Sequence, residues 1–292
     1  MKKYISILLV AFLFASCGQL KYNLFYAPLV KEDYQEQFSN YATIEKKYAY
    51  NGNFAIDSLS EKSNEKNIGR YHIWYPKEMR TSNKKYPVVV MANGTGVFAY
   101  RYVPIFEHLA SWGFIVIGNE DPSTWYGNST STTLDHILAL SKDKSSIFYN
   151  KIKANAIGLA GHSQGGVATF YAATEFDNSS VYKAICSMSG NNKDLASKIQ
   201  APILMIGGTG GIDAQAKKNM NDCYPLLNKK PVVMGVLKNT EHGVVLQRGD
   251  AYMTAWMCYW LKGDSQAGKC FVGSNPELMS NKAWSDTKKK NL

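Results

Sequence analysis

A serine at position 163 lies in the sequence "AGHSQGGVAT", between the closely spaced glycines Gly161 and Gly165. This G-x-S-x-G pattern is typical of the nucleophile elbow, a sharp turn that exposes a serine hydroxyl at the edge of a sheet. On its own the pattern also fits a glycine-rich turn with an inert serine. Here an apolar run precedes the turn and a helical pattern follows it, which favours the elbow. We therefore predict that Ser163 is a nucleophile.

A serine hydroxyl needs a base that accepts its proton, and His242 is the candidate. In chains with this elbow the order is serine, acid, histidine, and His242 is the only histidine after Ser163. It lies in "KNTEHGVV", just past the last apolar run, where a loop can bring it over the sheet edge. We expect His162 to turn away beneath the elbow, and His72 and His108 to be structural.

The acid of such a triad should follow an intervening strand and precede the histidine. Asp213 fits, because it lies in "APILMIGGTGGIDAQAKK" after an apolar run and before a helical pattern. Its role would be to hold one tautomer of the histidine and to stabilise the imidazolium. Asp194 and Asp222 are worse placed and are expected to be solvated surface carboxylates.

An oxyanion hole needs two backbone N–H groups aimed at the developing negative charge. The amide of Gln164, directly after the serine, is the first candidate. The second comes from the loop "MANGTGVFAY", where we assign the amide of Thr95, with Gly94 and Gly96 allowing a close backbone approach. The alternative for this loop is a plain turn between a strand and a helix.

Strands and helices alternate along the chain and would position these residues. Strands are predicted at 70–76, 86–92, 114–120, 155–161, 181–189, 201–208 and 231–237, and helices at 103–113, 131–146, 164–176 and 250–263. Continuous β-branched runs such as "YPVVVMA" are typical of strands buried on both faces. The alternation predicts an α/β fold with a mostly parallel central sheet flanked by helices.

No segment is long enough to form a large lid over the site. Lids in such folds are commonly inserted after the sixth strand, and only a short connector fits between about 189 and 201. We therefore expect an open, shallow site. Tyr100, Tyr102 and Trp125 lie on loops near the predicted sheet edge, so they are candidates to line the substrate site or to belong to the core.

The first twenty residues, "MKKYISILLVAFLFASCGQL", have the layout of an export signal. Two lysines precede a short apolar run, and small residues then lead to Cys17. The run is too short for a comfortable membrane span. The cysteine resembles the lipid-attachment site of bacterial lipoproteins, so we expect a lipid anchor at Cys17 and export to the bacterial cell envelope, at the periplasmic face or the cell surface. Ordinary signal cleavage is the alternative.

Four parts are expected along the 292 residues. These are a signal peptide at 1–16, an N-terminal tether and irregular layer at 17–68, a catalytic domain at 69–285 and a basic tail at 286–292. Four cysteines follow the signal, namely Cys186, Cys223, Cys258 and Cys270. Export permits disulfides, and Cys258 with Cys270 is the favoured pair, although four buried thiols are the alternative.

The formal charge of +10 is consistent with a basic solvated face or with an acidic partner. No basic stretch is interleaved with aromatic residues as in nucleic-acid binding, so no nucleic-acid partner is expected. No His/Cys cluster has metal-ligand spacing, so neither a metal nor an organic cofactor is expected. The oligomeric state is not determined by the sequence.

From about Tyr86 to Trp284 the chain resembles the branch of the α/β-hydrolases that contains dienelactone hydrolases, chlorophyllases and bacterial, cutinase-like polyester hydrolases. The resemblance is carried by "YPVVVMANGTG", "LASWGFIVI", "GHSQGG", "APILMIGGTGGID", "EHG" and "AYMTAWMCYWLKGDSQAGKCFVGSNPE". It implies the α/β-hydrolase fold and hydrolase activity.

Four positions depart from the polyester hydrolases of that branch. Thr95 stands where they have an aromatic residue, and Gln164 stands where they have methionine. The tryptophan of their aromatic clamp would fall near Gly190 or Asn191. Their acid lies about where Gly211 stands. These departures weigh against polyester cleavage.

The predicted function is that of a serine hydrolase, most simply a carboxylesterase that acts through an acyl-enzyme on a small-molecule or polymeric ester. A peptidase or amidase could use the same triad. A surface lipoprotein that binds ligands with a catalytically idle hydrolase fold is the alternative from another class, and the complete triad argues against it.

Overall fold

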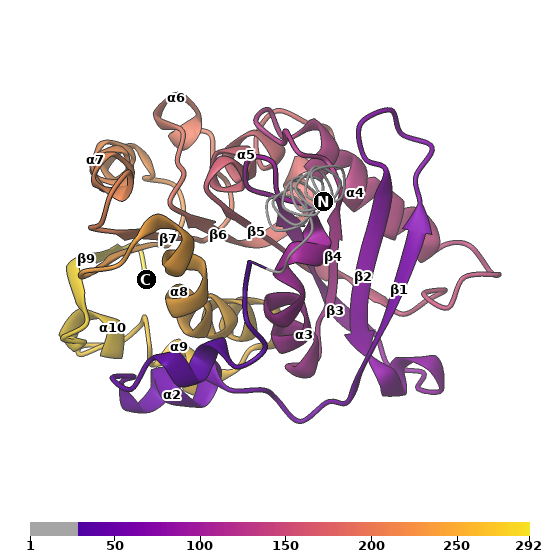
Figure 1. Ribbon diagram of the computed structural model, residues 1–292, viewed down its shortest axis with the longest axis horizontal. Coiled ribbons are helices and arrows are strands. Elements are labelled where there is room, and N and C mark those ends of the chain that lie inside the picture. Colours follow the sequence, from indigo (N-terminus) through magenta and orange to yellow (C-terminus); the bar gives the residue numbers. More distant parts are fainter. Residues whose placement is uncertain (1–28) are drawn as a thin grey trace, which may run out of the picture.

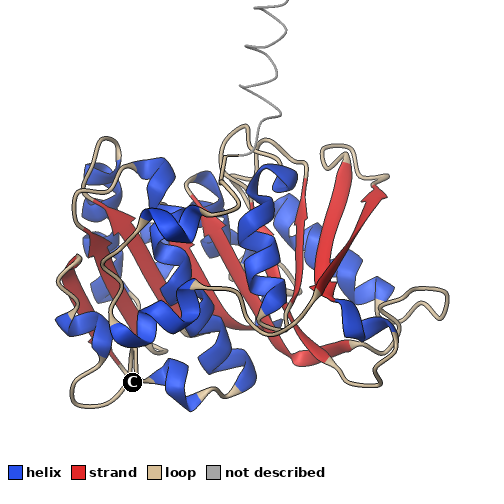
Figure 2. Cartoon of the chain, turned by 60° about the horizontal axis from the view of Figure 1, so that its bottom comes forward, coloured by secondary structure: helices blue, strands red, loops and turns tan. Residues whose placement is uncertain are grey.

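Nine strands form one sheet in the computed structural model, which describes residues 29–292 (Figures 1 and 2). Their order across the sheet is β1-β2-β4-β3-β5-β6-β7-β8-β9. The strands are β1 (Ile56–Lys62), β2 (Arg70–Pro76), β3 (Tyr86–Ala92), β4 (Ile115–Asn119), β5 (Ile152–His162), β6 (Tyr182–Met188), β7 (Ile203–Gly208), β8 (Val232–Leu237) and β9 (Trp284–Lys290).

The centre of the sheet, from β4 through β3 and β5 to β8, is parallel, and only the pairings of β1, β2 and β9 are antiparallel. Every residue of β3 is buried, as expected for a strand covered on both faces. Parallel strands end at the same edge, so the loops after β3, β5, β7 and β8 meet there. This edge is where ligands bind in open α/β sheets.

Helices cover both faces of the sheet. α3 (Val103–Ser111) and α8 (His242–Met257) lie on one face of the sheet, with α4 (Asn128–Leu140) and α5 (Gln164–Ala172) on the other (Figure 1). α7 (Asp213–Cys223) joins the second face. Alternate strand side chains therefore enter two separate apolar clusters, one on each side of the sheet. This arrangement confirms the α/β-hydrolase fold.

The remaining helices are short, and within residues 29–292 none of them is large enough to form a lid. They include α2 (Thr43–Ala49), α6 (Lys193–Ala196), α9 (Ser265–Gly268) and α10 (Glu277–Ser280). The connector between β6 and β7 contains only α6, whose first turn is capped by the side chain of Asn192. Within residues 29–292, nothing larger lies between these two strands.

Two segments that were expected to lie outside the catalytic domain carry regular structure. The N-terminal part at 17–68 contributes α2 and β1, and the expected basic tail at 286–292 lies mostly in β9. β9 pairs antiparallel with β8 through Trp284, which is buried, and ends in three consecutive lysines. Neither segment has a long apolar run, so their pairing partners, rather than their own hydrophobicity, stabilise them.

The favoured disulfide is wrong, because Cys186, Cys223, Cys258 and Cys270 are all free and buried. Burial raises the pKa of each thiol above its ordinary value. Within residues 29–292 no helix combines the length and apolar character that a membrane crossing requires. The predicted signal peptide and Cys17 lie outside the described residues.

Candidate active site

Ser163 stands at the turn between β5 and α5, with φ of 60° and ψ of −122°. A non-glycine residue in such a conformation costs about 1–3 kcal/mol, so its surroundings must hold it there. Its backbone N–H donates to the carbonyl of Met188 at 2.8 Å, which fixes the turn against β6. The sequence prediction of a nucleophile elbow is therefore matched by a strained serine at the end of a central strand.

Gly161 and Gly165 are required by the space around the elbow. A Cβ atom on Gly161 would lie 2.2 Å from the carbonyl oxygen of Gly165, and one on Gly165 would lie 2.1 Å from that of Ala92. Backbone cannot move aside as a flexible side chain can. Both positions therefore accept only glycine without a shift of the main chain.

His242 and Asp213 form a direct pair at the same sheet edge. Nδ1 of His242 lies 2.5 Å from Oδ1 of Asp213, whose side chain is fully buried. Each begins a helix, since Asp213 is the first residue of α7 and His242 the first of α8. His242 was expected on a free loop; instead the helix begins at that residue, which fixes the histidine backbone more firmly.

Two further donors hold the second oxygen of Asp213. The backbone N–H of Gly208 and the hydroxyl of Ser189 both lie 2.8 Å from Oδ2. Gly208 ends β7 and Ser189 follows β6, so neighbouring strand ends provide both contacts. These two residues were not predicted from the sequence, and only their position at strand ends could have indicated them.

His162 contacts His242 rather than Ser163. Its Nε2 lies 2.9 Å from the carbonyl oxygen of His242, and the two rings are 4.7 Å apart. Burial, together with the neighbouring His242, lowers the pKa of His162 to about 4. A neutral imidazole can donate from Nε2 to that carbonyl and still add no positive charge beside His242.

Two backbone amides are available for an oxyanion hole. Gln164 is the first residue of α5, where amide groups have no partner within the helix. Thr95 lines the same cavity as Ser163, whereas the amide of its neighbour Gly94 donates to the hydroxyl of Tyr102 at 3.2 Å. The side chain of Gln164 accepts a 2.7 Å bond from the amide of Thr124, which holds it away from the cavity.

The cavity at this edge has a volume of 570 Å³ and includes Ser163 and His242 in its lining. Of the three aromatic residues proposed to line it, only Tyr102 does so. Tyr102 is almost fully buried, and burial raises its pKa to about 12. Tyr100 and Trp125 are not part of this lining; Tyr100 packs beside the ring of His72, and Trp125 is 46% exposed.

The chemistry of the site follows from these positions. Ser163, His242 and Thr95 line one mostly apolar cavity, Asp213 holds the histidine, and the amide of Gln164 directly follows the serine. This set can activate a hydroxyl for attack on a carbonyl carbon and stabilise the resulting oxyanion. Among residues 29–292, no three His, Cys, Asp or Glu side chains are grouped so that they could hold a metal ion.

A family model described as PET hydrolase-like matches residues 38–291, which is most of the chain. The match spans the elbow, the acid and the histidine. No curated protein matches the chain.

Proposed function

The chain belongs to the PET hydrolase-like family, and from this premise we propose that it is a serine carboxylesterase that works through an acyl-enzyme. The observation that carries the proposal is the 2.5 Å pair between His242 and Asp213 beside the strained Ser163. The family's description indicates ester hydrolysis. The pair gives that chemistry a base and an orienting acid in this chain.

In the proposed mechanism the Ser163 hydroxyl attacks the ester carbonyl while Nε2 of His242 accepts its proton. Asp213 keeps the proton of His242 on Nδ1 and stabilises the imidazolium. The amides of Thr95 and Gln164 donate to the oxyanion. His242 then gives its proton to the leaving alcohol, and the acyl group remains on Ser163.

Deacylation reverses these roles with water in place of the alcohol. His242 accepts a proton from water, the hydroxide attacks the acyl carbon, and the carboxylic acid leaves as Ser163 recovers its proton. The open cavity supports this step, because no large lid within the described chain covers Ser163.

Small aliphatic esters and aliphatic polyesters are the proposed substrates. Thr95 lines the cavity at the place of an aromatic residue of polyester hydrolases, and Gly190 and Asn191 are buried near the place of their clamp tryptophan. Without these rings, the site offers less stacking to an aromatic polymer unit.

We also propose that the enzyme is an exported lipoprotein of the bacterial cell envelope, anchored through Cys17. The layout of the first seventeen residues supports this proposal. Metabolic labelling with an alkyne fatty acid should mark the wild-type chain and leave Cys17→Ser unmarked. Labelling of both would contradict lipidation at Cys17.

The activity is tested with a fluorophosphonate probe on the full chain purified in detergent. The wild type should be labelled, and Ser163→Ala and His242→Ala should lose labelling and lose ester turnover by on the order of 10⁴-fold or more. Ser145→Ala and His136→Ala are matched controls, because both residues lie outside the cavity lining, and they should retain both signals.

Paired substrates then separate an esterase from an amidase. The kcat/KM for a p-nitrophenyl ester should be much higher than that for the p-nitroanilide of the same acid. Preferential cleavage of the anilide, or folded wild-type protein that the probe does not label, would refute the proposed function.

A further inference from the structure

An N-terminal strap, defined here as residues 29–55, reaches the mouth of the catalytic cavity. Leu29 and Val30 line that cavity together with Ser163 and His242. The backbone N–H of Leu29 donates to the carbonyl of Arg101 at 3.0 Å, which ties the strap to the segment before α3. Val30 is 2% exposed, whereas Leu29 is 44% exposed and stands at the rim.

The first part of the strap lies outside the family match, which begins at residue 38. The proposed catalytic residues lie within the matched range, but Leu29 and Val30 lie outside it. A wall built by such a segment can differ between relatives while the triad stays the same. This wall can therefore change which esters the enzyme prefers, while the reaction carried out by the triad stays the same.

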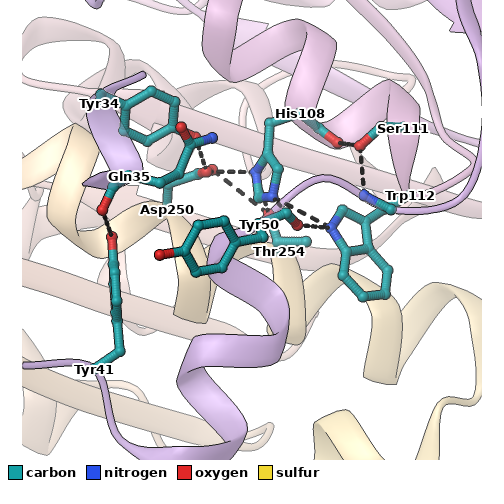
Figure 3. A network of polar contacts seen from close by, with 10 residues as sticks. Tyr34, Gln35, Tyr41, Tyr50, His108, Ser111, Trp112, Asp250 and Thr254 are labelled. Carbon is teal, nitrogen blue, oxygen red and sulfur yellow. Dashed lines mark hydrogen bonds and ion pairs between the residues drawn. The ribbon is translucent and has the colours of Figure 1, made fainter. Parts of the chain in front are cut away.

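A buried polar network holds the strap in place (Figure 3). The hydroxyl of Tyr34 bonds to Asp250 in α8, and the same carboxylate oxygen lies 2.5 Å from Nδ1 of His108 in α3. Nε2 of His108 lies 2.9 Å from the carbonyl oxygen of Tyr50, back in the strap. Asp250 and His108 are both essentially inaccessible.

A second contact holds the middle of the strap on the same helix. Glu45 in α2 forms a buried ion pair with Arg248 in α8, and its backbone N–H donates to Glu277 at 2.7 Å. Both the start and the middle of the strap are therefore fixed to the helix that begins at His242. A wall that is ordered before substrate arrives costs little entropy on binding.

We propose that Leu29 and Val30 select the aliphatic group of the ester, so that the strap is a specificity-determining element. Beside the ring of Tyr102, four further side chains of the cavity are apolar, namely Val97, Ile212, Val244 and Leu246. These are aliphatic, and a flexible hydrocarbon chain packs well against such a surface. This inference rests on the proposed esterase function.

The test is a chain-length profile, measured on the full chain with p-nitrophenyl esters from acetyl to decanoyl and with alkyl acetates of matching length. Leu29→Trp fills the rim, and Val30→Ala opens the wall. In at least one series, Leu29→Trp should lower the ratio of kcat/KM for the longest to the shortest ester about tenfold. Val30→Ala should shift the preferred length upward.

Leu292→Trp is the matched control, because Leu292 is 42% exposed and lies outside the cavity lining. It should keep the wild-type rates and profile. Thermal melting checks that each variant is folded. If Val30→Ala does not fold, Leu29→Trp still tests the inference, because a substitution at the exposed Leu29 should not disturb folding. Wild-type labelling by fluorophosphonate with unchanged profiles in the folded variants would overturn this inference alone. Absence of wild-type labelling and turnover would overturn the proposed function and this inference with it.

Discussion

At the scale of single residues, Asp213 has the most complete set of contacts in the site. Oδ1 contacts Nδ1 of His242, while Ser189 and Gly208 donate to Oδ2. The charge is thus stabilised by donors that do not depend on water. Charge-assisted bonds of this kind are stronger than neutral ones, and they fix the direction of the carboxylate as well as its charge.

Removing the Ser189 hydroxyl should lower kcat with little change in KM. A hydrogen bond to a charged group is worth about 1.5–3 kcal/mol, so a loss of about tenfold to a hundredfold is expected. Ser189 has φ of 51°, so Ser189→Gly removes the hydroxyl without backbone strain and Ser189→Ala provides the comparison. Steady-state ester hydrolysis measures the effect. Full activity of Ser189→Gly would show that the hydroxyl does not support the acid.

His162 should make stability depend on pH in the mildly acidic range. Its folded pKa is about 4, below the ordinary value of about 6.5, so only the unfolded chain gains a proton between these values. Neutral His162 therefore makes its full contribution to the free energy of unfolding above pH 6.5. As pH falls toward 4, that free energy decreases by on the order of 3 kcal/mol. Urea unfolding of His162→Asn should be less sensitive to pH than the wild type. An unchanged pH dependence in His162→Asn would contradict this prediction.

At the scale of elements, α8 joins catalysis to the attachment of the strap. It begins at His242 and carries Asp250 about two turns later, where the carboxylate contacts His108 of α3 and Tyr34 of the strap. The sequence predicted a helix only from 250. Its first two turns lack a clear apolar stripe, and contacts with α2 and β7 stabilise them.

The His108–Asp250 pair should contribute stability that declines at alkaline pH. Burial opposes a charged imidazole, but the Asp250 carboxylate outweighs this effect and raises the pKa of His108. The contribution is therefore complete below about pH 6.5 and is lost as pH rises through the raised pKa. His108→Gln should lower the free energy of unfolding by about 3–5 kcal/mol at pH 6, and by less at pH 9.

Chemical denaturation at the two pH values tests this expectation. His136→Gln is the control, because the pair of His136 with Glu61 is partly exposed and should be worth less than about 1 kcal/mol. An equal loss for His108→Gln at both pH values would contradict a charged buried histidine.

At the scale of the whole molecule, the sequence predicted the central sheet well, and the three residues proposed as a triad lie at one edge of it. Buried strands have continuous apolar runs, and the order of serine, acid and histidine follows from the elbow. β1, β9 and the strap were not predicted, since they are polar segments stabilised by distant partners. Tyr34, for example, contacts Asp250 across more than two hundred residues.

The four described cysteines should behave as unreactive thiols in the native protein. They are buried, and their raised pKa values disfavour the thiolate that reacts. Ellman's reagent should therefore react with them only after denaturation, and a reducing agent should leave Tm unchanged. A decrease of Tm with dithiothreitol would reveal a stabilising disulfide.

The two outermost strands have a consequence for how copies of this molecule meet. Among residues 29–292, β1 and β9 each have no strand on their outer side, and such rows of backbone groups can recruit a strand from another copy. β9 ends in Lys288, Lys289 and Lys290, and β1 carries Asp57, Glu61 and Lys62. Charges on an edge oppose continuous pairing between copies. The sheet is therefore protected against aggregation where many copies are crowded together.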